Sequence, residues 1–282
     1  MRRELSTEEE GGCSRLVFEP SGSVSAGMVM LHGLGGHAAR HDRVLSCFSE
    51  SGIAVVAPDL PGHGKSPGKR GHIPRIELVD TILRGAFDRV KEIAPDGPWG
   101  IGGHSMGALL VLDHCARGAC EKYAWAWLSS ALLEPAHGKP GWLYGLCRGI
   151  DKLWPSLTIS SGVRRDACYD PAAVGITADQ ERASGTHRRI SIRLGMELLR
   201  AARRVERGAG KLFADIPVLM THGEADTICP MQYARALFDV LPARDKEFLT
   251  ITDARHEPWH DPELVATVCR WMRGRVGSPS PA

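Results

Sequence analysis

The sequence predicts an α/β protein, with a mostly parallel central sheet flanked by helices. Three observations lead to this fold class. Short β-rich runs alternate with longer helical patterns, as in chains built from strand–helix–strand units. Several of these runs are apolar throughout, which is typical of strands buried on both faces. A length of 282 residues suits one large core that carries an insertion.

The expected elements follow one another along the chain. Strands are predicted at residues 28–32, 53–57, 99–103, 123–130, 218–222 and 248–251. Helices are predicted at residues 40–51, 75–94, 105–117, 231–241 and 262–272. The stretch before Met28 is short, so an early strand is expected to be missing or irregular.

The alternation of strands and helices stops between residues 134 and 216. We therefore expect residues 1–133 and 217–273 to form the core, residues 134–216 to form an inserted helical cap, and residues 274–282 to be a disordered tail. The first cap helix, at 140–154, carries an apolar stripe that either packs on the core or lies partly open to lipid. The stripe consists of Trp142, Leu143, Leu146, Cys147, Ile150, Leu153 and Trp154.

The composition excludes several classes of function. A formal charge of +2 gives no strongly basic face, so we expect no nucleic-acid partner. No apolar stretch follows Arg2 and Arg3, and no apolar run approaches the roughly 18 residues that span a bilayer. Neither a secretory signal nor a transmembrane segment is therefore expected. The eight cysteines include no C-x-x-C pair, so we expect free thiols, no zinc site and a cytoplasmic protein.

One short motif indicates the chemistry. Residues 103–107 read Gly-His-Ser-Met-Gly, the G-x-S-x-G pattern, in which the glycines let a strand turn sharply into a helix and leave the serine hydroxyl exposed. The pattern is weak by itself, because a glycine-rich chain contains it by chance. Its place between a predicted strand and a predicted helix makes Ser105 the candidate nucleophile.

A serine hydroxyl needs a base, and the base needs an acid that holds its tautomer. Asp226 and His256 follow the last two predicted strands, at the carboxyl edge where open α/β sheets bind ligands. The order Ser105, Asp226, His256 is the chain order of α/β-hydrolase triads. Glu224 and His260 are nearby rivals. We prefer His256 as the base, because His260 leads into the last predicted helix.

Two backbone N–H groups are candidates for an oxyanion hole. Leu34 lies in the glycine-rich turn after the first predicted strand, and Met106 follows the candidate nucleophile. Such donors typically stabilise a tetrahedral oxyanion by a few kcal/mol each. The glycine-rich loop at residues 59–66 lacks the spacing of a phosphate-binding loop, so we reject nucleotide binding.

These motifs together resemble the α/β-hydrolase superfamily and, within it, the monoacylglycerol lipase and lysophospholipase branch. The similarity covers about residues 15–273, and the matching runs are residues 32–40, 59–66, 68–72, 103–107, 222–226 and 256–257. His41 and the pair Leu60-Pro61 depart from the family pattern. They leave the three catalytic candidates untouched, but they bear on the choice of substrate.

The resemblance implies an eight-stranded sheet under a helical cap. It also implies hydrolysis of a single-chain glyceride ester through an acyl-enzyme, with no cofactor and no metal. Ser105 is then the nucleophile, His256 the base and later the acid, and Asp226 its orienting partner. Leu34 and Met106 are the oxyanion donors.

We expect the substrate to be a monoacylglycerol or a lysophospholipid-like lipid ester, with its acyl chain in an apolar channel between cap and core. Trp142, Leu143 and Leu146 are expected to line this channel, and Cys229 to be a pocket thiol without a catalytic role. Peripheral membrane contact through the cap is one option, and the sequence leaves the oligomeric state open.

Several other functions fit the same motifs. They are a general short- or medium-chain carboxylesterase, an acyltransferase, an aminopeptidase that releases N-terminal proline, and a non-catalytic interaction protein. The aminopeptidase needs carboxylates in the cap to hold the free amine of its substrate, whereas arginine dominates the cap of this chain. The interaction protein is disfavoured because all three catalytic candidates are present.

Overall fold

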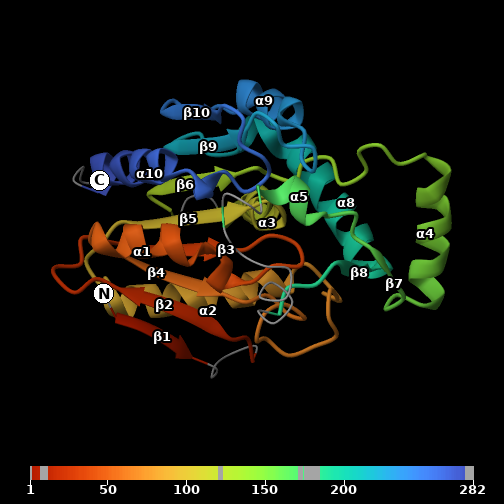
Figure 1. Cartoon of the computed structure of the whole chain (residues 1–282), viewed down its shortest axis with the longest axis horizontal. Helices are drawn as coiled ribbons and strands as arrows, with labels where there is room; N and C mark the ends of the chain where they lie inside the picture. Colours follow the sequence, from red (N-terminus) through yellow and green to blue (C-terminus); the bar gives the residue numbers. More distant parts are fainter. Residues whose placement is uncertain (1, 7–11, 120–122, 171–173, 175–184, 277–282) are drawn as a thin grey trace.

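The computed structural model describes residues 2–6, 12–119, 123–170, 174 and 185–276. Its centre is an eight-stranded sheet with the strand order β1-β2-β4-β3-β5-β6-β9-β10 (Figure 1). β2 pairs antiparallel with β1 and β4, and the other pairs of this sheet are parallel. The prediction of a mostly parallel sheet is therefore confirmed. The strands are β1 (Arg2–Ser6), β2 (Arg15–Glu19), β3 (Ala26–Leu31), β4 (Ile53–Pro58), β5 (Trp99–His104), β6 (Trp125–Ser129), β9 (Val218–Gly223) and β10 (Lys246–Ile251).

The strand β2 shows that the expectation of a missing or irregular early strand was wrong. Leu16, Val17 and Phe18 are buried, and the strand pairs with β4 with Arg15 opposite Pro58. Three consecutive apolar residues are too short a pattern to stand out in the sequence. Because β2 lies between β1 and β4 and pairs with both, these three residues are inside the sheet, where both faces are covered.

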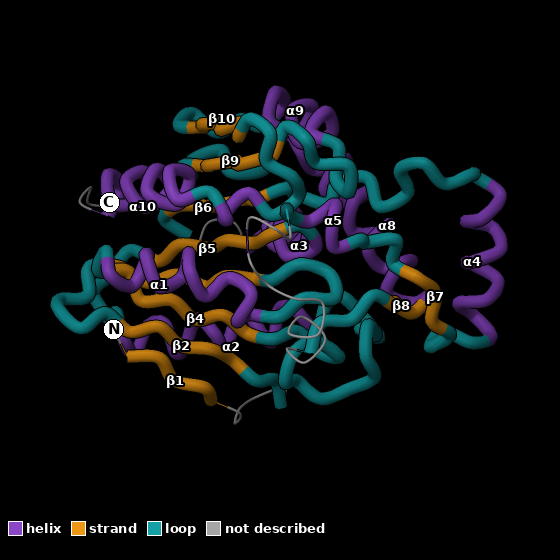
Figure 2. Tube along the Cα trace, viewed as in Figure 1, coloured by secondary structure: helices purple, strands orange, loops and turns teal. Residues whose placement is uncertain are grey.

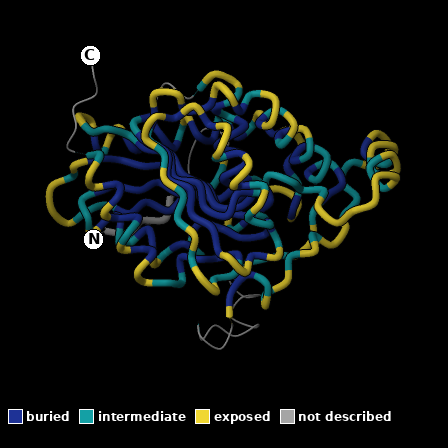
Figure 3. The backbone as a smooth tube through the Cα atoms, turned by 90° about the horizontal axis from the view of Figure 1, so that it is seen from above, coloured by how far each residue is buried: buried dark blue, intermediate teal, exposed yellow. Residues whose placement is uncertain are grey.

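Helices cover both faces of the sheet (Figures 1 and 2). One layer consists of α1 (Asp42–Glu50) and α10 (Pro262–Val276), and the other of α2 (Leu78–Ile93), α3 (Met106–His114), α8 (Ile192–Gly208) and α9 (Met231–Val240). Within β3, Val29 and Leu31 pack with α2 and α3, whereas Met28 and Met30 pack with α1 and α10. Figure 3 shows the sheet as a continuous buried band. The predicted strands are apolar at successive positions because both of their faces are covered.

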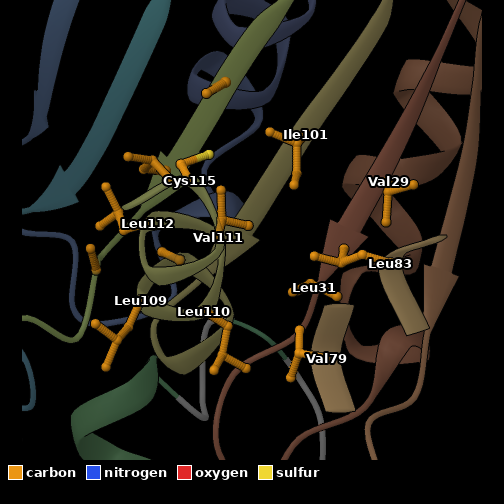
Figure 4. Packing of buried hydrophobic residues seen from close by; sticks show 14 of the residues in the cluster. Val29, Leu31, Val79, Leu83, Ile101, Leu109, Leu110, Val111, Leu112 and Cys115 are labelled. Carbon is orange, nitrogen blue, oxygen red and sulfur yellow. The ribbon is translucent and has the colours of Figure 1, made fainter. Parts of the chain in front are cut away.

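The helix α3 is apolar on every side because it is buried on every side. It packs against β5 on the sheet and against α2 and α8 in its own layer. Figure 4 shows its residues among those of β3, β5 and α2. The labelled side chains of this cluster are Val29, Leu31, Val79, Leu83, Ile101, Leu109, Leu110, Val111, Leu112 and Cys115.

Between β6 and β9 the chain adds α4 (Trp142–Leu153), β7 (Thr158–Ser160), α5 (Arg165–Cys168) and β8 (Arg189–Ser191), followed by α8. α4 and the antiparallel pair β7–β8 project from the side of the core (Figure 1). α8 instead packs on α3, with Leu194 and Leu198 in the main core and Arg204 bound to the fully buried Asp113 of α3. We call this segment between β6 and β9 the insertion; the boundaries of an inserted cap at 134 and 216 stay a prediction.

Three further expectations concern termini, cysteines and membranes. α10 continues to Val276, beyond the predicted end of the core at residue 273, and residues 277–282 of the predicted tail lie outside the described residues. The seven cysteines in the described part of the chain are free thiols. None of the described helices is long and apolar enough to cross a bilayer.

A buried histidine lies between the α1–α10 layer and the carboxyl edge of the sheet. His41 ends a short 3₁₀ turn, η1 (Ala38–His41), and its ring lies 4.6 Å from that of Trp259 and 5.7 Å from that of His104, between centroids. Neither ring nitrogen has a hydrogen-bond partner within the described ranges. Burial lowers the pKa of His41 to about 3, so this imidazole is neutral in the folded protein at neutral pH.

We predict that His41→Leu flattens the dependence of stability on pH. Between about pH 6.5, the ordinary pKa of an unfolded histidine, and the folded pKa of about 3, the unfolded chain binds a proton that the folded protein does not. Stability therefore falls as pH falls through this window. The variant should remove up to about 1.4 kcal/mol per pH unit from the slope. Urea unfolding at a series of pH values measures it.

The control for this experiment is Trp259→Phe. It changes the packing around His41 without removing a titrating group, so it should lower stability and keep the slope of the parent. A His41→Leu variant with the slope of the parent would contradict the assignment.

Candidate active site

Ser105 lies in a strained turn between β5 and α3. Its backbone has φ 54° and ψ −115°, a left-handed conformation that is rare for a residue other than glycine. A Cβ added to Gly103 would lie 2.4 Å from the backbone of Gly107, and one added to Gly107 would lie 2.3 Å from the carbonyl oxygen of Leu31. Both glycines of the G-x-S-x-G pattern are thus required by close approach of the backbone. The weak motif marks a real strand–turn–helix junction.

Asp226 and His256 are brought together at the carboxyl ends of β9 and β10. His256 Nδ1 donates a hydrogen bond of 2.7 Å to Asp226 Oδ2, and both residues are buried. Asp226 Oδ1 accepts from the backbone N–H groups of Ile228 and Cys229, each at 2.9 Å. His222 Nε2 lies 3.2 Å from Asp226 Oδ2. The carboxylate therefore orients His256 while its own position is held by several donors.

The surroundings of Asp226 keep it ionised. Burial alone would raise the pKa of this carboxyl group, but the charge of His256 and the hydrogen bonds from His222, His256 and the Cys229 N–H outweigh burial. The net result is a pKa far below the usual range. An imidazolium at His256 would thus face a permanent negative charge.

Glu224 and His260, the alternative candidates for the acid and the base, do not take part in the pair formed by Asp226 and His256. Glu224 is exposed to solvent. His260 Nε2 lies 3.3 Å from Glu257 Oε2 and takes part in that pair instead. Among these four residues, the hydrogen-bonded acid–imidazole pair is the one formed by Asp226 and His256.

The loop after β3 and the start of α3 flank Ser105. A Cβ added to Gly33 would lie 3.3 Å from Ser105 Cβ, so the backbone that leads to Leu34 runs directly beside the candidate nucleophile. Met106 is the first residue of α3. Ser105, His256 and Leu34 together line a small cavity, which covers about 550 Å³ when the open solvent at its mouth is counted. The backbone at Leu34 and Met106 therefore lies close to the serine, and the role of these two residues as oxyanion donors stays a prediction.

Cys229 touches the candidate nucleophile. Burial raises the pKa of this thiol well above its usual range, the charge of Asp226 raises it further, and a hydrogen bond with Ser105 opposes both effects. The thiol is therefore protonated at neutral pH and is a poor nucleophile, since reactivity belongs to the thiolate.

An ion pair that the sequence does not predict lies beside His256. Arg40 Nη2 binds Glu257 Oε1 at 2.5 Å, and both side chains are largely buried. Burial alone would raise the pKa of Glu257, but Arg40 and His260 lower it to about 2. The Glu257 N–H also donates to the carbonyl oxygen of Cys168 in α5, at 2.8 Å. The loop of His256 is thus tied both to the turn before α1 and to the insertion. Arg40 and Glu257 each end a run that matched the family, but nothing in the sequence pairs residues 217 positions apart.

A second and larger cavity also opens on Ser105. It covers about 1520 Å³, counting the open solvent at its mouth, and extends under the insertion, between apolar residues of α4, β7, β8 and α8. Ser105, Leu34 and Val163 line both cavities, so the serine lies where they meet. The lining of the larger cavity includes Leu132, Leu143, Ile159, Ile190, Ile192, Met196, Leu198, Leu199 and Ile228.

Of the three residues expected to line the acyl channel, one lines the larger cavity and two do not. Leu143 lines the larger cavity. Trp142 and Leu146 are 69% and 52% exposed and are not among the residues that line it, so the structure does not place these two in the expected channel. The apolar stripe of α4 is too wide for one face, so part of it faces the cavity and part faces solvent.

The described residues offer no metal site, since no group of three His, Cys, Asp or Glu side chains among them could hold an ion. The site can perform chemistry with its own side chains. A hydroxyl in a strained turn, a nearby imidazole and a buried carboxylate hydrogen-bonded to that imidazole are the components of nucleophilic acyl transfer.

Comparisons with known proteins agree with this chemistry. An abhydrolase domain-containing protein of Dictyostelium discoideum is 28% identical over 278 residues, which is 96% of this chain, and the chain spans only 29% of that protein. A monoacylglycerol lipase of Mycolicibacterium smegmatis is 27% identical over 259 residues, 91% of each chain. The crystal structure of Paleococcus ferrophilus monoacylglycerol lipase is similar, with a TM-score of 0.82 and 29% identity over 93% of this chain and 99% of that one.

A family model also matches most of the chain. The model is described as serine aminopeptidase, S33, and it covers residues 22–263, which include the turn at Ser105 and the pair formed by Asp226 and His256. The chain belongs to this family and is a serine hydrolase with the α/β-hydrolase fold.

Proposed function

We propose that this serine hydrolase cleaves the ester bond of monoacylglycerols or lysophospholipid-like lipids, which carry a single acyl chain. The observation that carries the proposal is the large apolar cavity that opens on Ser105. A fatty acyl chain gains free energy from burial and needs no hydrogen bonds, and such a cavity supplies that environment. The monoacylglycerol lipase names of a relative and of a similar structure support the same substrate class.

The proposed reaction proceeds in two halves. His256 takes the proton of Ser105 as the hydroxyl oxygen attacks the ester carbonyl carbon, and Asp226 stabilises the resulting imidazolium. The N–H groups of Leu34 and Met106 donate to the oxyanion. The tetrahedral intermediate collapses, and the alcohol leaves with the proton from His256. His256 then takes a proton from water as the water oxygen attacks the acyl-enzyme carbonyl carbon. It returns this proton to the Ser105 oxygen as that ester bond breaks and the fatty acid leaves.

The two cavities correspond to the two products. The acyl chain would occupy the larger apolar cavity, and the alcohol part would occupy the smaller one, whose lining includes Arg40, His41, Arg188 and Glu257. A general carboxylesterase or an acyltransferase would use the same chemistry. An interaction protein without activity would need no aligned acid–base pair.

We predict that Ser105→Ala lowers kcat/KM for a monoacylglycerol by at least about ten-thousandfold, because the attacking oxygen is gone while the oxyanion donors and the cavity remain. A fluorophosphonate probe should label the parent and not the variant. Ser21→Ala is the matched control, since Ser21 is an exposed serine that lines neither cavity. A Ser105→Ala variant as active as its parent would refute the mechanism. A parent that prefers acetyl esters to long-chain glycerol monoesters would favour a general esterase.

We also propose that the outer face of α4 contacts lipid, with the protein otherwise in the cytoplasm. This face, which we call the α4 patch, gathers four large exposed apolar side chains: Trp142, Leu146, Leu153 and Trp154. Arg148 and Lys152 are exposed on the same helix, so an anionic surface would attract it. A helix that projects from the core can reach a bilayer without moving the sheet (Figure 1).

We predict that the double variant Leu153→Glu, Trp154→Glu weakens binding to vesicles that contain phosphatidylglycerol by at least about tenfold, since each apolar side chain contributes on the order of 1.5–3 kcal/mol on burial. Co-sedimentation measures binding. Hydrolysis of a water-soluble short-chain ester should stay unchanged. The control is Val240→Glu, which changes an exposed apolar residue of α9 outside the α4 patch. An equal loss in the control, or none in the double variant, would contradict lipid contact through this patch.

A further inference from the structure

A further cavity lies beyond the larger one, between α8 and α9. It covers about 1050 Å³, counting the open solvent at its mouth. Leu199, Ala202 and Val205 of α8 form one side, and Ala236, Leu237 and Val240 of α9 form the other. Nothing in the proposed mechanism uses this distal cavity. Its walls are mainly apolar, while the exposed charges of Arg203 and Glu206 lie along its lining toward solvent.

The two cavities share one wall. Glu134, Pro135, Tyr144 and Leu199 line both of them. Tyr144 projects from α4, and its hydroxyl donates a hydrogen bond of 2.9 Å to the carbonyl oxygen of Ala136, in the loop between β6 and α4. The ring is thereby held across the space between α4 and this loop. It is the largest side chain of the shared wall and, unlike Leu199, it is fixed at its far end.

We propose that Tyr144 sets the upper limit of acyl-chain length, and that the distal cavity between α8 and α9 is an extension of the acyl site that the Tyr144 ring closes. The proposal rests on the proposed function, because it takes the larger cavity to be the acyl site. An apolar chain cannot be recognised by hydrogen bonds, so the position of the wall decides which chains fit. Each further buried methylene gives roughly a fourfold gain in binding.

The test measures kcat/KM for nitrophenyl esters from acetyl to hexadecanoyl. Tyr144→Ala removes the wall, so the ratio of kcat/KM for the hexadecanoyl ester to that for the octanoyl ester should rise by at least about tenfold, which corresponds to access for two or more further methylenes. Because the ratio is taken within one variant, a smaller folded fraction does not change it. Leu199→Ala opens the same wall from α8 and should shift the ratio in the same direction, which keeps the test available if Tyr144→Ala does not fold.

Two controls separate the wall from other effects. Tyr144→Phe keeps the ring and should keep the length profile of the parent. Adding Ala202→Leu to Tyr144→Ala fills the distal cavity, since Ala202 lines that cavity alone, and should restore the limit of the parent. A shift in Tyr144→Phe as large as in Tyr144→Ala, or an unshifted profile in both Tyr144→Ala and Leu199→Ala, would overturn this inference while leaving the proposed function intact. A parent without activity on any long-chain ester would instead overturn the proposed function.

Discussion

The close approach of α3 to β3 is the constraint on which the rest of the site depends. At Gly107 there is no room for a Cβ beside the carbonyl oxygen of Leu31, so the first turn of α3 lies directly on the end of β3. This contact forces the chain through the strained conformation at Ser105. It also brings the loop at Gly33 beside the serine, within contact distance of its Cβ. One backbone contact therefore places the candidate nucleophile and a candidate oxyanion donor together, and the burial of α3 on every side supports the strain.

Buried charges hold the other half of the site. Asp226 is an anion in a buried position, and two backbone N–H groups and two imidazoles offset the cost of its desolvation. Desolvation also makes the ion pair of Arg40 and Glu257 costly to bury, so we attribute to it the positioning of a loop and not a gain in stability. It links the residue immediately after His256 to the turn that precedes α1. The bond from Glu257 N–H to Cys168 extends this link to the insertion, so the proposed base is held by core and insertion together.

Features that depend on a few neighbouring residues could be predicted from the sequence. The two glycines around Ser105, and the positions of Asp226 and His256 after strands, are patterns within a few residues, and the sheet brings such positions to one edge whatever the details of packing. The Arg40–Glu257 pair could not be predicted, because it depends on how two distant loops meet. The strand β2 was missed because its three apolar residues have no periodicity of their own. For α4, the sequence identified an apolar stripe, but which part faces the cavity depends on how the helix packs against α8 and its neighbouring loop.

The two longer helices of the insertion, α8 and α4, differ in how they contact the core. α8 is anchored, because Leu194 and Leu198 are buried against α3 and Arg204 binds the buried Asp113. α4 projects from the core, and its apolar residues face both ways: Leu143 and Tyr144 toward the cavity, Leu153 and Trp154 toward solvent. The proposed lipid contact on the outside and the proposed wall of the acyl cavity on the inside therefore belong to the same element. Because Tyr144 of α4 and Leu199 of α8 form part of this wall, the proposed depth of the cavity depends on where α4 lies against the anchored α8.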